Sequence, residues 1–229
     1  MIQHLACIMD GNRRWAKKQG LRPWLGHNQG AESVKRVIQF ALDQDIKYVS
    51  LYTFSIENFK RSEQEISHLF SLLVRVLRDN VVKYIEQGVR IHFIGDENLF
   101  PEAVKETILF MQEQTKDCSK LHLNLLFCYG GQQEIFGAVK KVLSHIKNGL
   151  LALEDFTEDL FKKYLWMGNI PEPELIIRTG GTKRLSNFLL YQAAYSELYF
   201  LDCLWPDITE QDLQTAVTEF KRIQRNLGG

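Results

Sequence analysis

Short apolar runs alternate with longer segments of helical periodicity along the whole chain. This alternation is typical of βαβ units, in which consecutive strands lie parallel and helices cover the sheet. Six apolar runs are predicted to be strands, at residues 4–9, 48–54, 89–95, 121–127, 174–178 and 198–201. The pattern therefore predicts an α/β fold with a mainly parallel, six-stranded sheet flanked by helices.

The longest helical pattern begins after Ser62. Ser62 and Glu65 have the spacing of a capping box, in which a hydroxyl and a carboxylate each accept the other residue's free N–H. Apolar residues then recur at helical spacing to about Glu86, which predicts one helix of roughly 36 Å. Its apolar stripe is expected to face the core, and the alternative is that part of it lines a tunnel for an alkyl chain.

Five further helices are predicted from periodicity and caps. They cover residues 30–42, 101–115, 133–146 and 157–165, and the last one follows Thr209. No Pro/Gly/Ser-rich stretch or run of charge marks a linker, so residues 1–229 are expected to form one domain.

Charge and cysteine content narrow the class of protein. Lys+Arg and Asp+Glu are equal at 28 each, which disfavours a protein that binds nucleic acid mainly through phosphates. The four cysteines are scattered without a C-x-x-C pair, as expected of reduced thiols in the cytoplasm. No apolar stretch approaches the roughly 18 residues of a membrane span, and no signal peptide is expected. We therefore expect a cytoplasmic protein whose contact with a membrane, if any, is peripheral.

The first predicted strand runs directly into Asp10, Gly11 and Asn12. A carboxylate at the carboxyl end of a central strand lies where open α/β sheets bind ligands. Positive charge then crowds the next residues, at Arg13, Arg14, Lys17, Lys18 and Arg22. The pattern favours a local anion site, and the alternative is a solvated basic face capped by an aspartate.

Two more polar clusters follow predicted strands. Ser55, Asn58 and Arg61 follow the second strand and could serve phosphate binding or proton transfer, although Asn58 also suits a turn. Residues 177–187 combine glycines, arginines and hydroxyls after the fifth strand, a plausible anion cradle. Neither a P-loop nor a dinucleotide fingerprint is present in the chain.

Carboxylates at Asp10 and Glu197 suggest a magnesium site. Mg²⁺ binds through one or two carboxylates, with substrate phosphates and water completing an octahedron. The six histidines have no zinc-binding spacing, and only His27, just beyond the basic cluster, is a candidate site residue.

Several motifs in register resemble those of the cis-prenyltransferase family. They are M-D-G-N-x-R-W-A from Met9, F-S-x-E-N from Phe54, R-T-G-G from Arg178 and R-L-S-N-F-L-L from Arg184. Further matches extend the resemblance over nearly the whole chain. The resemblance implies an undecaprenyl diphosphate synthase-like fold with a hydrophobic tunnel, a homodimer, and Mg²⁺-dependent extension of farnesyl diphosphate by isopentenyl diphosphate with cis double bonds.

The resemblance also implies residue roles. Asp10 would be the essential carboxylate and a ligand of Mg²⁺, Glu197 would complete the metal site from the same or the partner subunit, and Asn58 is suggested as the proton acceptor. Substrates would be bound by Gly11, Asn12, Arg13, Arg14, Trp15, Arg22, His27, Ser55, Ile56, Glu57, Phe59, Arg61, Arg178, Arg184, Leu185 and Ser186. The implied product is a long-chain polyprenyl diphosphate in the undecaprenyl range, a lipid carrier precursor for bacterial cell-wall synthesis, whose release suggests peripheral membrane contact.

Three positions depart from the family pattern. Arg13 replaces the usual glycine, the order Arg22-Pro23 is reversed, and Gln132 stands where arginine is common. The reversed order puts a phosphate contact by Arg22 in question.

Three alternative functions remain at this point. A trans-type prenyl synthase would need aspartate-rich D-D-x-x-D motifs, and the chain has no Asp-Asp pair. A non-catalytic partner subunit of the same fold is expected to lose Asp10 or the run from Arg184, and this chain keeps both. An unrelated phosphate-binding module would bind diphosphates without turnover.

Overall fold

The computed structural model describes residues 2–223 and contains a parallel sheet of six strands in the order β3-β4-β2-β1-β5-β6. All five strand pairings are parallel. The strands are β1 His4–Ile8, β2 Tyr48–Ser55, β3 Val89–Ile94, β4 Leu121–Tyr129, β5 Leu175–Arg178 and β6 Glu197–Phe200. The predicted fold class is therefore confirmed. Every residue of β1 and β5 is buried, as expected where both faces of a parallel sheet are covered.

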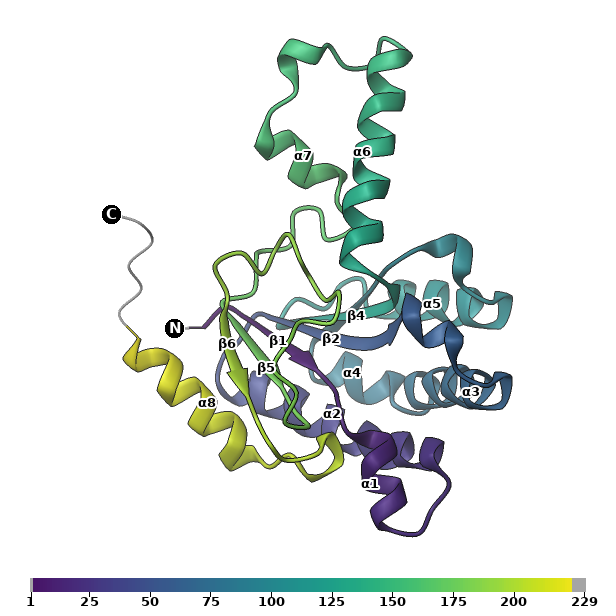
Figure 1. Ribbon diagram of the computed structural model, residues 1–229, viewed down its shortest axis with the longest axis vertical. Coiled ribbons are helices and arrows are strands. Elements are labelled where there is room, and N and C mark those ends of the chain that lie inside the picture. Colours follow the sequence, from purple (N-terminus) through teal and green to yellow (C-terminus); the bar gives the residue numbers. More distant parts are fainter. Residues whose placement is uncertain (1, 224–229) are drawn as a thin grey trace.

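Eight α-helices surround this sheet within the described residues (Figure 1). They are α1 Asn12–Lys18, α2 Gly26–Asp43, α3 Glu63–Asp79, α4 Val81–Glu86, α5 Glu102–Gln114, α6 Gly131–Lys147, α7 Glu158–Tyr164 and α8 Glu210–Arg222. One apolar core joins the sheet to α2, α4 and α8, and a second joins the opposite face to residues between 166 and 193. Figure 1 shows α6 and α7 rising away from the body of the molecule.

The single helix predicted over residues 63–86 is wrong, because the structure divides it into α3 and α4. Asn80 leaves the helical conformation with φ −113° and ψ 7°, and its Nδ2 donates to the carbonyl oxygen of Val76 over 2.7 Å. An asparagine side chain that bonds to backbone competes with the helical ladder. The straight segment is therefore α3 alone, about 26 Å long at 1.5 Å per residue.

Two helices near the N-terminus also differ from the sequence-based prediction. Helix α2 begins at Gly26, not Gly30, and α1 was not predicted at all, since its seven residues are mostly polar and carry no apolar period. The predicted cap at Thr209 is confirmed, because Thr209 Oγ1 accepts the Asp212 N–H over 3.2 Å and Asp212 Oδ2 accepts the Thr209 N–H over 2.8 Å.

None of the helices within residues 2–223 has the length and apolarity needed to cross a bilayer.

Candidate functional site

Asp10 follows β1, and its carboxylate lies between two arginines. Arg14 Nη2 donates to Oδ1 over 3.2 Å, and Arg178 Nη2, at the end of β5, donates to Oδ2 over 3.0 Å. Because β1 and β5 are parallel neighbours, their carboxyl ends meet at the same edge of the sheet. The structure therefore brings together Asp10, Arg14 and Arg178, which the sequence predicted as site residues.

Two residues after β5 hold Asp10 in this position. Thr179 Oγ1 donates to the carbonyl oxygen of Asp10 over 2.7 Å and lies 3.1 Å from its N–H as an acceptor. Gly180 has φ +85°, and a Cβ at this position would lie 2.3 Å from Arg14 Nη2. Only glycine leaves space for the Arg14 guanidinium beside Asp10.

Arg178 is buried, at 5% exposure, and links Asp10 to the loop after β5. Its Nη1 donates to Ser186 Oγ over 2.8 Å and to the carbonyl oxygen of Arg184. Arg184 Nε donates to the same Ser186 hydroxyl over 3.3 Å. The Nε of Arg178 is buried without a hydrogen-bond partner in the described part of the chain. Arg178, Arg184 and Ser186, predicted together from sequence, thus form one cluster with an unused donor, as suits an anion.

The sequence analysis missed Asn187, which connects this loop to two other elements. Asn187 Nδ2 donates to Glu57 Oε1 over 2.7 Å and to Gln133 Oε1 over 3.0 Å, while its Oδ1 accepts the Gln132 N–H over 2.8 Å. Its φ is +66°, a conformation that asparagine tolerates better than most residues. The signal available in the sequence was an asparagine directly after Ser186, a residue type that suits this backbone conformation.

The sequence analysis also assigned Glu65 only to a helix cap, whereas the structure places its carboxylate beside two arginines and a histidine. Ser62 Oγ accepts the Glu65 N–H over 3.3 Å, as predicted. The second half of the capping box is wrong, because Glu65 Oε1 instead lies 3.0 Å from Arg61 Nη1, 3.8 Å from Arg13 Nε and 3.9 Å from His27 Nε2. Glu65 is 3% exposed, so a buried carboxylate holds Arg61, Arg13 and His27 at one site.

The pKa values of Glu65 and His27 are both lowered, but for different reasons. His27 and Arg61 lower the pKa of the Glu65 carboxyl, and of the two only Arg61 is within hydrogen-bonding distance. Burial lowers the pKa of His27. Glu65 therefore stays ionised and His27 is neutral near pH 7, which leaves the ring nitrogen of His27 available as a hydrogen-bonding group.

Asn58 has a structural contact in addition to its place in the site. Its Oδ1 accepts the Ser55 N–H over 3.2 Å, which closes the turn at the end of β2. Asn58 nevertheless lines the same pockets as Arg61 and Tyr52. The two readings of Asn58, turn residue and site residue, therefore both hold geometrically.

Asn12 and Gly11 form the floor beside Asp10. Asn12 Nδ2 donates to the carbonyl oxygen of Met9 over 3.2 Å, while its Oδ1 is buried without a partner among the described residues. Gly11 has φ +114°, and a Cβ there would lie 2.9 Å from a Leu204 methyl group. Close packing against Leu204 is thus a physical reason for glycine at this position.

Several predicted substrate-binding residues also have contacts within the protein. Trp15 Nε1 donates to Asp207 Oδ1 over 2.7 Å, and the Arg22 guanidinium lies 5.8 Å from the Trp24 ring centroid. Phe59 packs edge-on against Phe54 at 5.0 Å. Leu185 packs against the second core. Ile56 begins the short 3₁₀ turn that carries Glu57.

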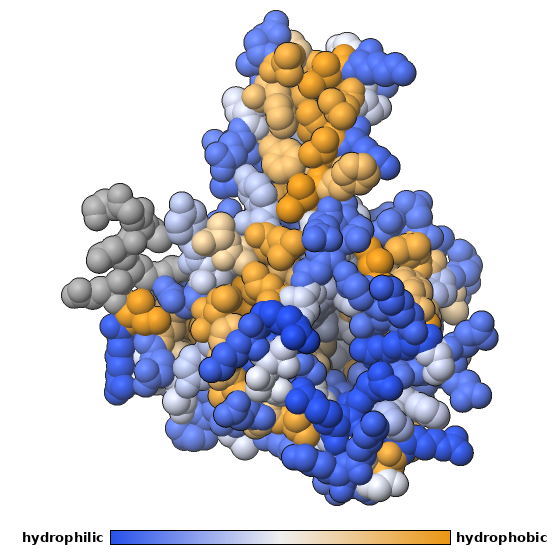
Figure 2. Space-filling model, in the orientation of Figure 1, coloured by the Kyte–Doolittle hydropathy of each residue, from blue (hydrophilic) through white to orange (hydrophobic). Residues whose placement is uncertain are grey.

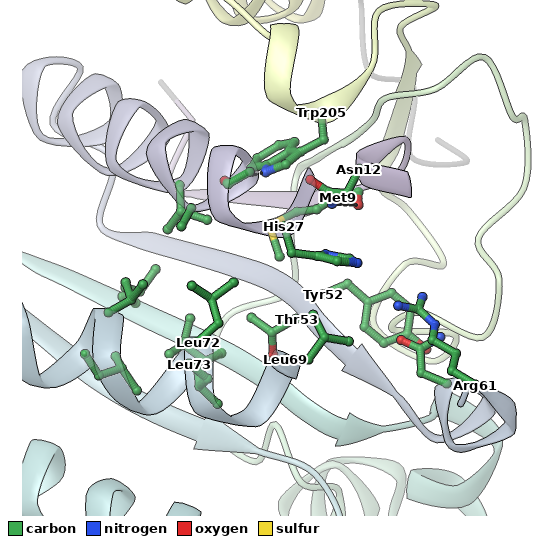
Figure 3. A pocket seen from close by; sticks show the side chains of 18 of the residues that line it. Met9, Asn12, His27, Tyr52, Thr53, Arg61, Leu69, Leu72, Leu73 and Trp205 are labelled. Carbon is green, nitrogen blue, oxygen red and sulfur yellow. Dashed lines mark hydrogen bonds between the residues drawn. The ribbon is translucent and has the colours of Figure 1, made fainter. Parts of the chain in front are cut away.

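Three pockets meet at Met9 and Arg61. The apolar pocket lies between α2, α3 and the sheet and encloses about 920 Å³ of empty space, its open mouth included (Figure 3). The Arg14 pocket adds Asp10, Gly11, Arg13, Arg14 and Lys17, and the Ser186 pocket adds Asp10, Glu57, Arg178, Ser186 and Asn187. An alkyl group and two anionic groups can therefore occupy adjoining spaces.

The inner wall of the apolar pocket consists of α3 side chains at helical spacing. It is formed by Leu69, Leu72, Leu73, Val76 and Leu77, with Leu123, Leu125 and Tyr84 completing it. Figure 3 shows the leucines of α3 facing His27 and Trp205 across the space. Part of the predicted apolar stripe, on α3, thus lines a pocket, and the tunnel for an alkyl chain stays a prediction.

Glu197 does not approach Asp10 within one chain. It begins β6 and pairs in register with Leu175 at the start of β5, whereas Asp10 follows the carboxyl end of β1. Parallel strands place these carboxylates at opposite ends of the sheet. The intrachain Asp10–Glu197 pair considered from sequence is therefore wrong, and only a partner subunit could supply Glu197 to this site.

The donor set around Asp10 fits Mg²⁺. The carboxylate is 31% exposed and borders both the Arg14 and Ser186 pockets, where substrate phosphates would meet it. One carboxylate with phosphate and water ligands is a normal arrangement for Mg²⁺. Residues 2–223 contain no group of three or more His, Cys, Asp and Glu side chains arranged for a metal, so the chain supplies few ligands of its own.

Comparison with known proteins agrees with this arrangement. The sequence profile of the prenyltransferase family that includes undecaprenyl diphosphate synthase matches residues 8–228 of this chain. An isoprenyl transferase of Clostridium perfringens is 42% identical over 100% of this chain and 90% of its own length. A tritrans,polycis-undecaprenyl-diphosphate synthase (geranylgeranyl-diphosphate specific) of Pyrococcus abyssi is 40% identical over 99% of this chain and 86% of its own.

A solved structure is also similar over the full chain. Lavandulyl diphosphate synthase from Lavandula x intermedia, in complex with dimethylallyl diphosphate, superposes with a TM-score of 0.96 at 32% identity, covering 100% of this chain and 98% of its own. Its match extends to the α6 and α7 projection as well as the sheet. Sequence identity, fold and pocket chemistry thus converge, and the chain belongs to the cis-prenyltransferase family and is a prenyltransferase.

Proposed function

We propose that this enzyme condenses isopentenyl diphosphate units onto farnesyl diphosphate with cis double bonds. The observation that carries the proposal is the meeting of one apolar pocket and two arginine-containing pockets at Met9 and Arg61. The prenyl tail of the allylic substrate fits the apolar pocket and its diphosphate the Arg14 pocket. The Ser186 pocket then takes the diphosphate of isopentenyl diphosphate.

The residues suit the bond changes of this reaction. The allylic C1–O bond breaks and diphosphate leaves with the electron pair, while the double bond of isopentenyl diphosphate attacks C1. Arg13, Arg14 and Arg61 lie where negative charge develops on the leaving oxygens, which lowers the barrier by preorganised electrostatics. Apolar side chains around the tail exclude water from the electron-poor carbon.

We propose Mg²⁺ as the cofactor, bound by Asp10 and, from the partner subunit, by Glu197. Bound Mg²⁺ supplies Lewis-acid stabilisation of the diphosphate charge. Arg178 orients Asp10, and Arg184 and the Ser186 hydroxyl hold the second diphosphate.

Loss of the final proton needs an acceptor near Asn58. The Asn58 Oδ1 already accepts the Ser55 N–H, and an amide is a weak base. We assign Asn58 to the site of proton loss, with the departing diphosphate as the acceptor.

A homodimer is part of the proposal. Side chains of α6 and of the segment after it expose apolar groups, with Phe136 61%, Leu143 60%, Leu150 72% and Leu153 68% exposed. Figure 2 shows apolar side chains gathered on the projecting α6–α7 arm. A contiguous exposed apolar surface is typical of a protein interface, and a second copy there would cover it.

The product is proposed to be a long-chain polyprenyl diphosphate, undecaprenyl by resemblance, with the lipid-carrier role in cell-wall synthesis that this length would serve. Such a product would leave into lipid, which supports peripheral contact with a membrane.

The test is direct incubation of the purified protein with labelled isopentenyl diphosphate, Mg²⁺ and either farnesyl or geranylgeranyl diphosphate, with EDTA as the control. Mass spectrometry gives chain length and NMR gives double-bond geometry. Cis products that grow from farnesyl diphosphate support the proposal. Growth only from geranylgeranyl diphosphate would overturn the starter, and binding without incorporation would overturn the reaction.

A further inference from the structure

Tyr52 occupies the boundary between the apolar pocket and the Ser186 pocket. Four residues line both of these pockets, and they are Met9, Tyr52, Asn58 and Arg61. Figure 3 shows Tyr52 and Arg61 together at one end of the apolar space, away from the leucines of α3. If the proposed condensation is correct, the allylic C1 and the attacking double bond meet at this boundary.

The Tyr52 ring is fixed from behind by other aromatic rings. It stacks on the fully buried Phe188 at 4.8 Å and 28°, and meets Tyr129 edge-on at 6.0 Å and 81°. The Tyr52 hydroxyl lies 3.3 Å from the Ser186 carbonyl oxygen and 3.4 Å from that of Tyr129. Ring stacking and these two acceptors hold the side chain in one orientation.

The Tyr52 hydroxyl is poorly placed to act as a base. Burial raises the pKa of the phenol, and the nearby Glu57 carboxylate raises it further. The hydroxyl therefore stays protonated, with its donor directed to neutral carbonyl oxygens.

The ring itself has the property that the reaction needs at this boundary. When the C1–O bond breaks, positive charge develops on the allylic carbons before the new carbon–carbon bond is complete. Arg61 carries the wrong charge to stabilise it, and Tyr52 is the one aromatic side chain among the four shared residues. The negative electrostatic face of an aromatic ring attracts a cation, and the attraction is strongest in a desolvated site.

We infer that the ring of Tyr52 stabilises the developing allylic cation, and that its electron density, not its hydroxyl, sets the rate of carbon–carbon bond formation. The inference rests on the proposed condensation.

The test replaces Tyr52 with phenylalanine and then with mono-, tri- and pentafluorophenylalanine, and measures the single-turnover rate with farnesyl diphosphate, isopentenyl diphosphate and Mg²⁺. Fluorine withdraws electron density with little change in shape. We expect a small loss for Tyr52→Phe and a stepwise fall to roughly 30-fold for the pentafluoro variant, about 2 kcal/mol at 1.36 kcal/mol per tenfold. The dissociation constant for farnesyl diphosphate, measured by calorimetry, should change less than the rate.

Tyr48 provides a matched control, because it lies on the same strand and the same face but at the opposite end of β2, stacked on His122 at 4.9 Å. Pentafluorophenylalanine there should leave the rate unchanged. Equal rates across the Tyr52 fluorine series would overturn the inference, as would a Tyr52→Phe variant as slow as Tyr52→Leu, since that result assigns the role to the hydroxyl. Failure of the unsubstituted enzyme to form any product would instead overturn the proposed function.

Discussion

Arg178 donates a hydrogen bond of 3.0 Å to the carboxylate of Asp10, although 168 positions separate the two residues in the sequence. The contact joins the ends of β1 and β5, and through Asp10 and Ser186 it connects the Arg14 pocket with the Ser186 pocket. The orientation of the one carboxylate at their junction thus depends on a buried guanidinium.

Replacing Asp10 should remove activity with little effect on folding. In Asp10→Ala, Arg178 keeps its bonds to Ser186 and to the Arg184 carbonyl, so part of its N–H groups stay hydrogen-bonded. We expect turnover to fall by at least roughly 100-fold, the scale for loss of one preorganised electrostatic group. Product formation and thermal unfolding are the measurements, with Asp43→Ala, on the exposed end of α2, as the control. A turnover rate near that of the unchanged enzyme would contradict the assignment.

Replacing Glu65 should weaken binding of the allylic diphosphate. Glu65→Gln removes the charge that holds Arg61, Arg13 and His27 together, and charge-assisted hydrogen bonds contribute about 1.5–3 kcal/mol. We expect KM for farnesyl diphosphate to rise roughly 10- to 100-fold. Glu63→Gln, at the exposed start of the same helix, should leave KM unchanged. If both variants behave alike, the Glu65 carboxylate has no role in substrate binding.

The length of the product should depend on Tyr84. This residue is 4% exposed and closes part of the inner wall of the apolar pocket from α4. Tyr84→Ala should lengthen the pocket and shift products to longer chains, at a stability cost of about 3–5 kcal/mol typical of large-to-small core changes. Tyr84→Leu should give an intermediate shift at a lower cost.

The neighbouring Ile85, 40% exposed, is the control for product length, because Ile85→Ala changes the same helix without reaching the pocket. Mass spectrometry of extracted products distinguishes the variants. An unchanged product distribution in both Tyr84 variants would show that the growing chain takes another path.

Stability should fall as the pH falls below neutrality because of His4. Burial lowers the pKa of His4 from 6.5 to about 4, so the folded state binds this proton less readily than the unfolded chain does. The stabilisation is complete above pH 6.5 and is lost as the pH falls toward 4. His4 alone should remove about 2 kcal/mol between pH 7.5 and pH 5.

Urea unfolding at the two pH values tests this. His4→Gln is less stable at pH 7.5, because it disturbs the bond of the ring to Ser50 Oγ at 2.7 Å, but its stability should depend less on pH than that of the unchanged protein. Equal pH dependence in the two proteins would mean that His4 does not titrate in this range. Burial also lowers the pKa of His92 to about 4, so part of the pH dependence should remain in His4→Gln.

Mixed dimers should reveal whether Glu197 acts across an interface. If each site combines Asp10 of one subunit with Glu197 of the other, a heterodimer of Asp10→Ala and Glu197→Ala chains has one intact site and one doubly damaged site. Random mixing makes half of the dimers heterodimers, so activity should recover to roughly a quarter of that of the unchanged enzyme. No recovery after verified subunit exchange would place Glu197 outside the site.

Local patterns in the sequence were enough to predict the six strands, most helices and the polar clusters after the first, second and fifth strands. Apolar period, cap residues and glycines report directly on backbone conformation, so these features do not depend on distant contacts. The resemblance carried by the motifs then identified the family, and the comparisons confirmed it. Asp10, Arg14, Arg178 and Ser186 were accordingly named before their contacts were known.

Tertiary structure decided how those residues meet. The capping spacing of Ser62 and Glu65 leaves the partner of the carboxylate open. Only the packing of α1 and α2 near the start of α3 brings Arg13 and His27 to Glu65. The apolar period to Glu86 continues through Asn80, where one side-chain bond to Val76 divides the helix. The sequence suggests Glu197 as a metal ligand beside Asp10. Within one chain, however, the parallel register places Glu197 at the far end of the sheet. Short-range pattern determines each element, but strand order and helix packing determine which side chains share a site, because both depend on contacts between residues distant in sequence.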